Sequence, residues 1–237
     1  MAYDGTAYSG WQIQPGRATV QGLVAAAARA LLGDALRVTG ASRTDAGVHA
    51  LRQVVSIQGA RDIAADVVGR ALNATLPRDI RVVACTDADE RFDARRAAAG
   101  KRYGYLLEDG PVPSPFLLRY AWHMPTPLDV TGMRRALQPL RGRHDFSAFC
   151  AAPGRAHEPT CTVRALHVLR RRERIALLVS GDRFLHHMVR NIVGSAVEVG
   201  RGAREPEWLG EVLAGRDRRR AGPTAPAHGL TLLRVVD

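Results

Sequence analysis

Lysine is almost absent from this chain of 237 residues, since Lys101 is the only one. Aromatic residues make up 5% of the sequence, and there are three cysteines. An odd number of scattered thiols does not form the paired pattern of a disulfide framework and is typical of a reducing compartment. We therefore expect a cytoplasmic protein.

Long apolar runs are lacking as well. No stretch of the sequence approaches the roughly 18 consecutive apolar residues that span a bilayer. The first residues, Met1 to Gly5, have neither the basic nor the apolar segment of a signal peptide. We therefore expect a soluble protein with no membrane partner. A hydrophobic content of 46% still allows a core, in one large domain or in two small ones.

The charge of the chain comes mainly from arginine. Lys and Arg together number 34 against 23 Asp and Glu, a formal net charge of +11. A GC-rich genome replaces lysine by arginine without changing the charge, so the positive excess still needs a cause. Arginine pairs with phosphate and stacks on bases. The charge therefore favours a nucleic-acid partner, with a merely solvated basic surface as the alternative.

The apolar pattern divides the chain into two α/β halves, residues 1–98 and 99–237. In the first half Thr19 can cap a helix that Gly33 closes, and Asp62 can open a second helix that ends near Pro77. The other expected elements are strands at the start and at residues 36–39, 54–57 and 80–85. The order β-α-β-β-α-β is that of ferredoxin-like or RNP-like domains.

The second half repeats this order with longer elements. Residues 163–169 and 175–180 flank a charged turn and predict a β-hairpin. The other expected elements are a strand over residues 103–107, a helix with Pro127 in its first turn, an apolar helix over 184–199 stopped by Gly200, a short helix over 206–213 and a strand over 230–236. We expect an α+β fold in which both halves join into one mixed, largely antiparallel sheet with a central cleft.

An unusual segment, residues 40–50, lies between two expected strands of the first half. Its small residues and Gly47 suit a tight backbone that holds one functional side chain outward. Asp45 is then a candidate active-site carboxylate, because Arg43 beside it favours the ionised form that a nucleophile or a base needs. An ordinary turn residue is the alternative.

Several blocks along the chain resemble one family. Residues 43–50, Arg-Thr-Asp-Ala-Gly-Val-His-Ala, are similar to the signature loop of the TruA family of tRNA pseudouridine synthases. The other similar blocks, in order, are residues 3–14, 19–21, 72–80, 101–105, 144–149, 184–194 and 224–230. The resemblance therefore covers nearly the whole chain and implies the pseudouridine synthase fold.

The resemblance also implies roles for single residues. Asp45 corresponds to the catalytic carboxylate, and Arg190 to the arginine paired with it. Tyr103 corresponds to the residue that contacts the substrate. The alternative for Tyr103 is an ordinary core tyrosine of the strand, which Tyr105, facing the same way, could equally be. Leu230 corresponds to the leucine that packs against the target base. Arg43 is a candidate to hold the neighbouring phosphate or to fill the space that the flipped base leaves.

The implied reaction isomerises uridine to pseudouridine in tRNA, at positions 38, 39 and 40 of the anticodon stem-loop. It needs no cofactor, and the sequence has no phosphate-binding loop or dinucleotide fingerprint. The base must leave its stack, so a pocket with a stacking ring and apolar walls is expected. The family also implies a homodimer. Some of the arginines at 170–174 and 216–220 are expected to contact the tRNA backbone.

Three other interpretations have less support. His144, Cys150, His157 and Cys161 could be drawn as a zinc site, but their spacing matches no common finger, so we expect no metal. A non-catalytic RNA-binding protein would leave the Asp45 loop unexplained and would lack the RNP aromatic motif. A nucleoside glycosidase normally needs two facing carboxylates.

The chain departs from the family in two places. Members usually carry several further residues before Tyr3, so the first strand is expected to be short. Asp93 and Arg96 stand where the family more often has His and Phe. Neither difference touches the Asp45 loop.

Overall fold

The computed structural model describes all residues except 35, 152–157 and 237. The chain divides into two units: unit 1 is Met1–Lys101 with Thr231–Asp237, and unit 2 is Arg102–Leu230. The sequence predicts the boundary after residue 98 and assigns the last strand to the second half. In the structure that strand, β11, groups with unit 1 because it pairs in parallel with β3.

The main sheet of unit 1 has the strand order β5–β1–β3–β11. β1 is antiparallel to both of its neighbours, β3 and β5. β2 and β4 pair with each other in a separate antiparallel ribbon. The bounds are β1 Ala2–Tyr3, β2 Arg37–Gly40, β3 His49–Ala50, β4 Val55–Gln58, β5 Ile80–Arg81 and β11 Leu230–Val236. β3 is an addition to the expected order, because the end of the candidate loop is itself a short strand beside β1.

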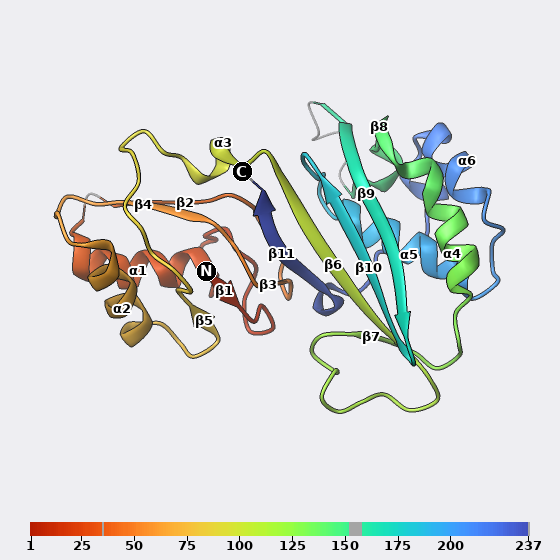
Figure 1. Ribbon diagram of the computed structural model, residues 1–237, viewed down its shortest axis with the longest axis horizontal. Coiled ribbons are helices and arrows are strands. Elements are labelled where there is room, and N and C mark those ends of the chain that lie inside the picture. Colours follow the sequence, from red (N-terminus) through yellow and green to blue (C-terminus); the bar gives the residue numbers. More distant parts are fainter. Residues whose placement is uncertain (35, 152–157, 237) are drawn as a thin grey trace. The chain divides into compact units, whose positions relative to one another are not determined.

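Two longer helices, α1 (Val20–Leu32) and α2 (Ala65–Thr75), lie together in unit 1, with the short α3 (Ala94–Ala97) elsewhere in the unit (Figure 1). α1 begins and ends as predicted. The Thr19 hydroxyl accepts a hydrogen bond from the backbone N–H of Gly22, and Gly33 closes the helix at φ 90°. The predicted start of α2 at Asp62 is wrong, because Ala64 is the residue that precedes its first turn.

The strand expected over residues 80–85 is shorter than predicted and ends at Arg81. The reason lies in the next residue. The side-chain amide of Asn73 accepts a hydrogen bond from Val82 N and donates one to Val82 O. Both backbone groups of Val82 are therefore bonded to a helix side chain and are not available for a sheet ladder.

The sheet of unit 2 has the strand order β6–β10–β9–β8, and β7 pairs in parallel with β6. The predicted hairpin is confirmed as β9 and β10, with Arg172 and Glu173 between the paired ends Arg171 and Arg174. The bounds are β6 Gly100–Asp109, β7 Trp122–Met124, β8 Gly142–Asp145, β9 Thr160–Arg171 and β10 Arg174–Gly181.

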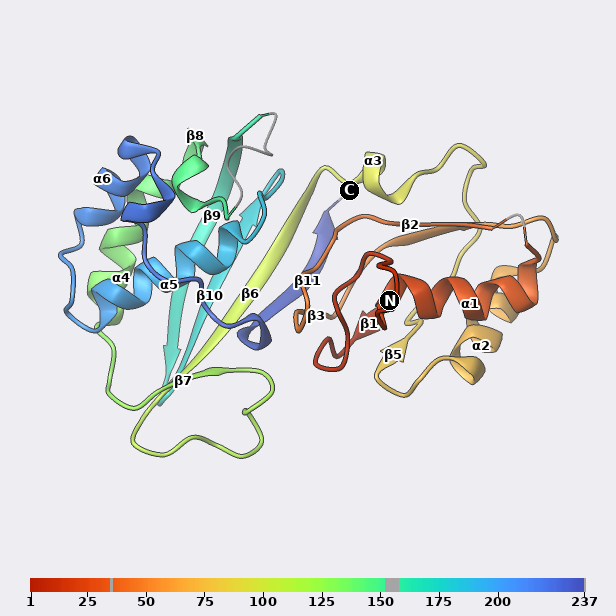
Figure 2. The same ribbon diagram turned by 180° about the vertical axis from the view of Figure 1, so that it is seen from behind.

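In the described part of unit 2 the helices are α4 Val130–Leu137, α5 Met188–Gly200 and α6 Trp208–Gly215, together with the short 3-10 turns η1 Gln138–Leu140, η2 Ser147–Phe149, η4 Arg218–Arg220 and η5 Ala227–Gly229. α5 covers one face of β9 and β10. It runs behind these strands in Figure 1 and in front of them in Figure 2.

Two helix starts in unit 2 differ from the sequence prediction. The apolar helix expected from residue 184 begins only at Met188, because His187 adopts a left-handed conformation with φ 59° that a continuing helix does not allow. The helix expected to begin around Pro127 starts at Val130, where the Asp129 carboxylate accepts a hydrogen bond from Thr131 N.

Each unit combines helices with strands that are mostly antiparallel, so the predicted α+β class is confirmed. Among the described residues, no helix combines the length and the apolar character that crossing a membrane requires. The central cleft stays a prediction.

Candidate active site

Asp45 lies in a tight turn of unit 1, as predicted. The backbone N–H of Val48 donates to the carbonyl of Asp45 at 3.1 Å and closes the turn. Gly47 has φ 78°, a backbone conformation that residues with a side chain rarely adopt. The Asp45 side chain is half-buried, and Arg43 is exposed two residues before it.

The segment before α1 holds this turn from one side. Trp11 N donates to Thr44 O at 3.0 Å, and the Tyr3 and Thr44 hydroxyls lie 2.8 Å apart. Gly10 has φ 88°, and a Cβ there would lie 2.6 Å from Thr44 O. The opening block of the sequence therefore supports the backbone next to Asp45 by direct contact.

Gln53 holds the loop from the other side and was missed by the sequence analysis. Its side chain is buried at 2% exposure and bonds to both backbone groups of Ser42. Its amide nitrogen also lies 3.4 Å from Tyr3 Oη. The signal in the sequence was weak, a glutamine next to a strand, and the partner eleven residues away is visible only in the structure.

His49, four residues after Asp45, is a buried structural residue of β3. Its Nδ1 lies 3.0 Å from Gly5 N and 3.1 Å from an Asp4 carboxylate oxygen. A backbone N–H can only donate, so Nδ1 accepts from Gly5 and cannot at the same time carry the proton that an ion pair with Asp4 needs. The hydrogen bond at this nitrogen is therefore the one from Gly5 N. It ties β3 to the opening segment.

Two tyrosines of β6 in unit 2 have different surroundings. Tyr105 is 1% exposed, donates from its hydroxyl to Pro226 O at 2.8 Å, and burial raises its pKa. A Cβ on Gly229 would lie 2.5 Å from the Tyr105 ring, so these residues pack without space between them. Tyr103 instead meets Phe184 edge to face, with ring centroids 5.4 Å apart. Both tyrosines are buried, Tyr103 at 7% exposure, so burial alone does not separate a core role from a substrate-contacting one.

Arg190 lies in the first turn of α5, half-buried. Its Nε donates to Ala225 O at 2.8 Å, and Ala225 N donates back to Arg190 O at 3.2 Å. This double link orients the guanidinium and joins α5 to the segment that leads to Leu230. Leu230 is 5% exposed and begins β11.

The segment before Leu230 is packed directly on α5. A Cβ on Gly194 would lie 1.7 Å from Pro223 O, so only glycine fits there. Arg218 donates to Asn191 Oδ1 and to Thr224 Oγ1, both at 3.1 Å. Sequence reasoning missed these partners, although a polar residue such as Asn191 inside an apolar helix is a signal that could have indicated them.

The two arginine clusters divide into structural and exposed members. Arg170 Nη2 lies 2.5 Å from the Asp109 carboxylate and also donates to Leu128 O. Arg218 is bonded inside unit 2, as described above. Arg216 lies 3.4 Å from Asp145, and Arg219 pairs with Asp217. Arg216 and Arg219 are nevertheless exposed, as are Arg171, Arg172, Arg174 and Arg220.

The candidate zinc ligands are only partly described, because His157 lies outside the described residues. His144 is paired in register with Cys161 across β8 and β9, and its Nε2 lies 2.8 Å from Arg141 O. Burial raises the pKa of the Cys161 thiol to about 11. A metal bound here would have to displace the thiol proton, because metals bind the thiolate.

The comparisons with known proteins agree with the loop and the blocks described above. A family model for tRNA pseudouridine synthase matches residues 1–95 and 136–236. "tRNA pseudouridine synthase A" of Myxococcus xanthus is 43% identical over 99% of this chain and 89% of its own length. The protein of that name from Brevibacillus brevis is also 43% identical, over 100% of this chain and 97% of its own length.

A solved structure titled "Crystal Structure of a Cbf5-Nop10-Gar1 Complex" is similar with a TM-score of 0.40 and 16% identity, over 82% of this chain and 44% of that chain. That likeness is too distant to add to the argument. The sequence matches define an RNA-modifying isomerase. The chain belongs to the tRNA pseudouridine synthase A family, with an α+β pseudouridine synthase fold and tRNA as its substrate.

Proposed function

We propose that Asp45 is the catalytic carboxylate and that the target uridines are those at positions 38, 39 and 40 of the tRNA anticodon stem-loop. The observation that carries the proposal is the support of the Asp45 turn on both sides, by Trp11 and by Gln53. A reacting group needs such support, because a small displacement of a reacting atom costs much of the rate.

The reaction breaks the bond between C1′ and N1 of uridine and forms one between C1′ and C5. The uracil turns between the two steps, N1 gains a proton and C5 loses one. An ionised Asp45 can serve by attacking C1′, by attacking C6, or by removing a ribose proton. All three routes use the same carboxylate and balance without a redox partner or a cofactor.

Four other residues complete the proposed site, each assigned by the family pattern. Tyr103 provides a ring against the flipped base, and Leu230 an apolar contact with it. Arg190 is the arginine that the family pattern assigns as the partner of the Asp45 carboxylate. Arg43, which is exposed, holds the phosphate next to the target nucleotide.

Two further properties belong to the same proposal. We infer a homodimer, because the family implies it and a two-fold arrangement lets one tRNA contact both subunits. We also infer a cytoplasmic location, which the three free thiols suit.

Tritium release from tRNA labelled at C5 of uridine tests the role of Asp45, because C5 loses its hydrogen only when pseudouridine forms. Asp45→Asn should release none while binding tRNA within a few-fold of the wild type, since the amide keeps the shape but is neither a nucleophile nor a base. Asp34→Asn is the matched control, because the Asp34 side chain is 99% exposed in the same unit. Turnover by Asp45→Asn, with deamidation excluded by mass spectrometry, would rule out the assignment.

The target positions need a separate test. Transcripts in which cytidine replaces uridine at 38, 39 and 40 should bind the enzyme but gain no pseudouridine. Mapping pseudouridine in the unaltered transcript should place it at those positions. Modification elsewhere would leave the family assignment intact and overturn the target.

A further inference from the structure

Within the described part of the chain, β8 is the strand beside the outer edge of β9, and it covers only part of that edge. β8 pairs with it only from Thr160 to Val163. β10 accompanies β9 on its other side along nearly the whole strand, as far as Arg171. The edge beyond Val163 faces the end of α4 and the turn η1, and a cavity of about 310 Å³ lies there.

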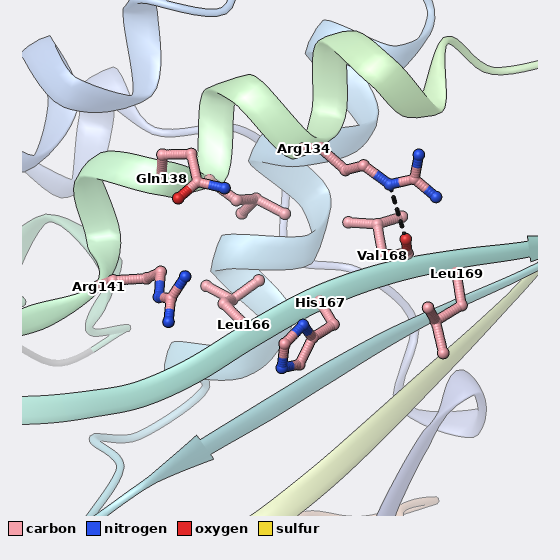
Figure 3. A pocket seen from close by; sticks show the side chains of 8 residues that line it. Arg134, Gln138, Arg141, Leu166, His167, Val168 and Leu169 are labelled. Atoms are coloured by element: carbon pink, nitrogen blue, oxygen red, sulfur yellow. Dashed lines mark hydrogen bonds between the residues drawn. The ribbon is translucent and has the colours of Figure 1, made fainter.

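Figure 3 shows this cavity, which we call the α4–β9 pocket. Its lining residues are Arg134, Leu137, Gln138, Arg141, Leu166, His167, Val168 and Leu169. All belong to unit 2, and none is among the proposed catalytic residues. The volume lies at the lower end of the range of small-ligand sites, about 300–1,000 Å³, and suits one or two nucleotide groups.

The charged side chains that line the pocket are positive. Arg134 and Arg141 both line it, and none of its described lining residues is acidic. Arg134 donates through Nε to Val168 O at 2.9 Å, which leaves its two terminal nitrogens for another acceptor (Figure 3). No ion pair or side-chain hydrogen bond of Arg141 is found within the described part of the chain.

A plainer role for these arginines is stabilisation of the negative end of α4. That role explains a basic residue in the last turn, and Arg135 there fulfils it equally. It does not explain why Arg134 and Arg141 lie on opposite sides of an open cavity with apolar residues between them (Figure 3).

An added β-strand from a peptide fits the pocket less well. Such a partner bonds to the free backbone groups of the edge strand. The Arg134 side chain already donates a hydrogen bond to the carbonyl of Val168, in the middle of the edge beyond Val163. An added peptide therefore cannot form a continuous ladder of backbone hydrogen bonds here, whereas an anion can still bind to the two arginines.

We propose that the α4–β9 pocket binds the RNA backbone of the tRNA substrate, with Arg134 and Arg141 on a phosphate and the exposed Leu169 against the adjoining sugar or base. The proposal rests on tRNA as the substrate and is independent of the role of Asp45. Planar guanidinium groups match the geometry of phosphate oxygens. The contact adds affinity and orientation without reading sequence.

The test compares two double variants with the same loss of charge. Arg134→Gln with Arg141→Gln removes the pocket arginines, and Arg135→Gln with Arg143→Gln removes two exposed arginines beside them that do not line the pocket. The Kd for a tRNA transcript is measured by filter binding over a series of salt concentrations. Binding does not depend on turnover, so the result is separate from the Asp45 experiment.

We expect the pocket variant to bind about tenfold more weakly and the control variant to stay within about twofold. The slope of log affinity against log salt should fall in magnitude by about 0.7–0.9 in the pocket variant, the value for one lost phosphate contact. An equal loss in both variants would show only long-range attraction, and no loss in either would leave the pocket without RNA. Both results overturn the proposal.

Arg134→Gln also removes the hydrogen bond to Val168 O and could destabilise the fold, so a second pair of variants is needed. Arg141→Gln alone, with Arg143→Gln as control, carries the test if thermal unfolding shows that the double variant is damaged. A photo-reactive benzoylphenylalanine at position 169, which is 52% exposed, should cross-link to labelled tRNA. Cross-linking only to a peptide or to a second copy of the chain would overturn the proposal.

Discussion

The side chain of Gln53 forms two hydrogen bonds with the backbone of Ser42. Its Oε1 accepts from Ser42 N at 3.2 Å, and its Nε2 donates to Ser42 O at 2.7 Å. Both residues are buried. The amide of Gln53 thus acts as a strand partner for a single residue and holds the start of the Asp45 loop in one position.

Replacing Gln53 by leucine should lower both stability and turnover. It removes the two hydrogen bonds that Gln53 forms with the buried backbone of Ser42, which costs about 2–3 kcal/mol in the free energy of unfolding. The looser loop should reduce kcat about a hundredfold with little change in the Kd for tRNA. Urea unfolding and single-turnover kinetics measure the two effects. Gln58→Leu, at an exposed glutamine, should change stability by less than about 0.5 kcal/mol.

Arg190→Met tests the proposed partner of Asp45. The methionine keeps the apolar bulk but removes the charge, so we expect a folded protein whose kcat falls about a hundredfold while tRNA binding changes little. Arg190→Lys should do better than the methionine variant yet stay impaired, because an ammonium lacks the planar grip of a guanidinium. If Arg190 only contacts phosphate, the methionine variant would bind tRNA weakly and keep its rate at saturating tRNA. Measuring both parameters separates the two roles.

Arg170 should matter for stability rather than for tRNA. Its partner Asp109 has a side chain that is only 1% exposed and also accepts from Leu128 N. Arg170→Met strands this carboxylate, which costs about 3–5 kcal/mol for a buried pair. The guanidinium is 34% exposed, so we expect a loss of about 3 kcal/mol. Adding Asp109→Asn should restore part of the lost free energy of unfolding, measured by urea. A double variant that is less stable than Arg170→Met alone would contradict this account.

Arg172, at the tip of the β9–β10 hairpin, is expected to contact the tRNA backbone. It adopts φ 55°, which asparagine tolerates, so Arg172→Asn removes the charge without straining the turn. The Kd for tRNA should rise a few-fold, and the salt dependence of binding should weaken by about 0.7–0.9 for one phosphate. Arg216→Asn is the matched control, with φ 51° and a guanidinium that lies near Asp145. Equal effects of the two variants would argue against the contact.

The sequence was informative where local chemistry decides the structure. The Thr19 cap, the Gly33 end of α1 and the hairpin of β9 and β10 follow from neighbouring residues, and each was predicted. The Asp45 turn was also predicted, because glycine and small residues favour it. The family blocks then indicated the activity more sharply than composition did.

The sequence was misleading where distant residues decide. Phe184 belongs to an apolar run that reads as helix, but its ring packs on Tyr103 and the helix starts four residues later. The early end of β5 depends on Asn73, and the support of the Asp45 loop on Gln53. The contacts of Asn73 and Gln53 are tertiary contacts of polar side chains, and the apolar periodicity of the sequence does not predict them.

Because β11 pairs in parallel with β3, the Asp45 loop gains this neighbouring strand only late in the synthesis of the chain. Thr231 and Leu232 lie opposite His49 and Ala50, and Leu51 N donates to Leu232 O. These partners flank the Asp45 loop, yet all of unit 2 separates them along the chain. A nascent chain on the ribosome therefore has the loop without one of its supporting strands until unit 2 has emerged. We infer that an incomplete chain cannot hold the Asp45 loop in its final form.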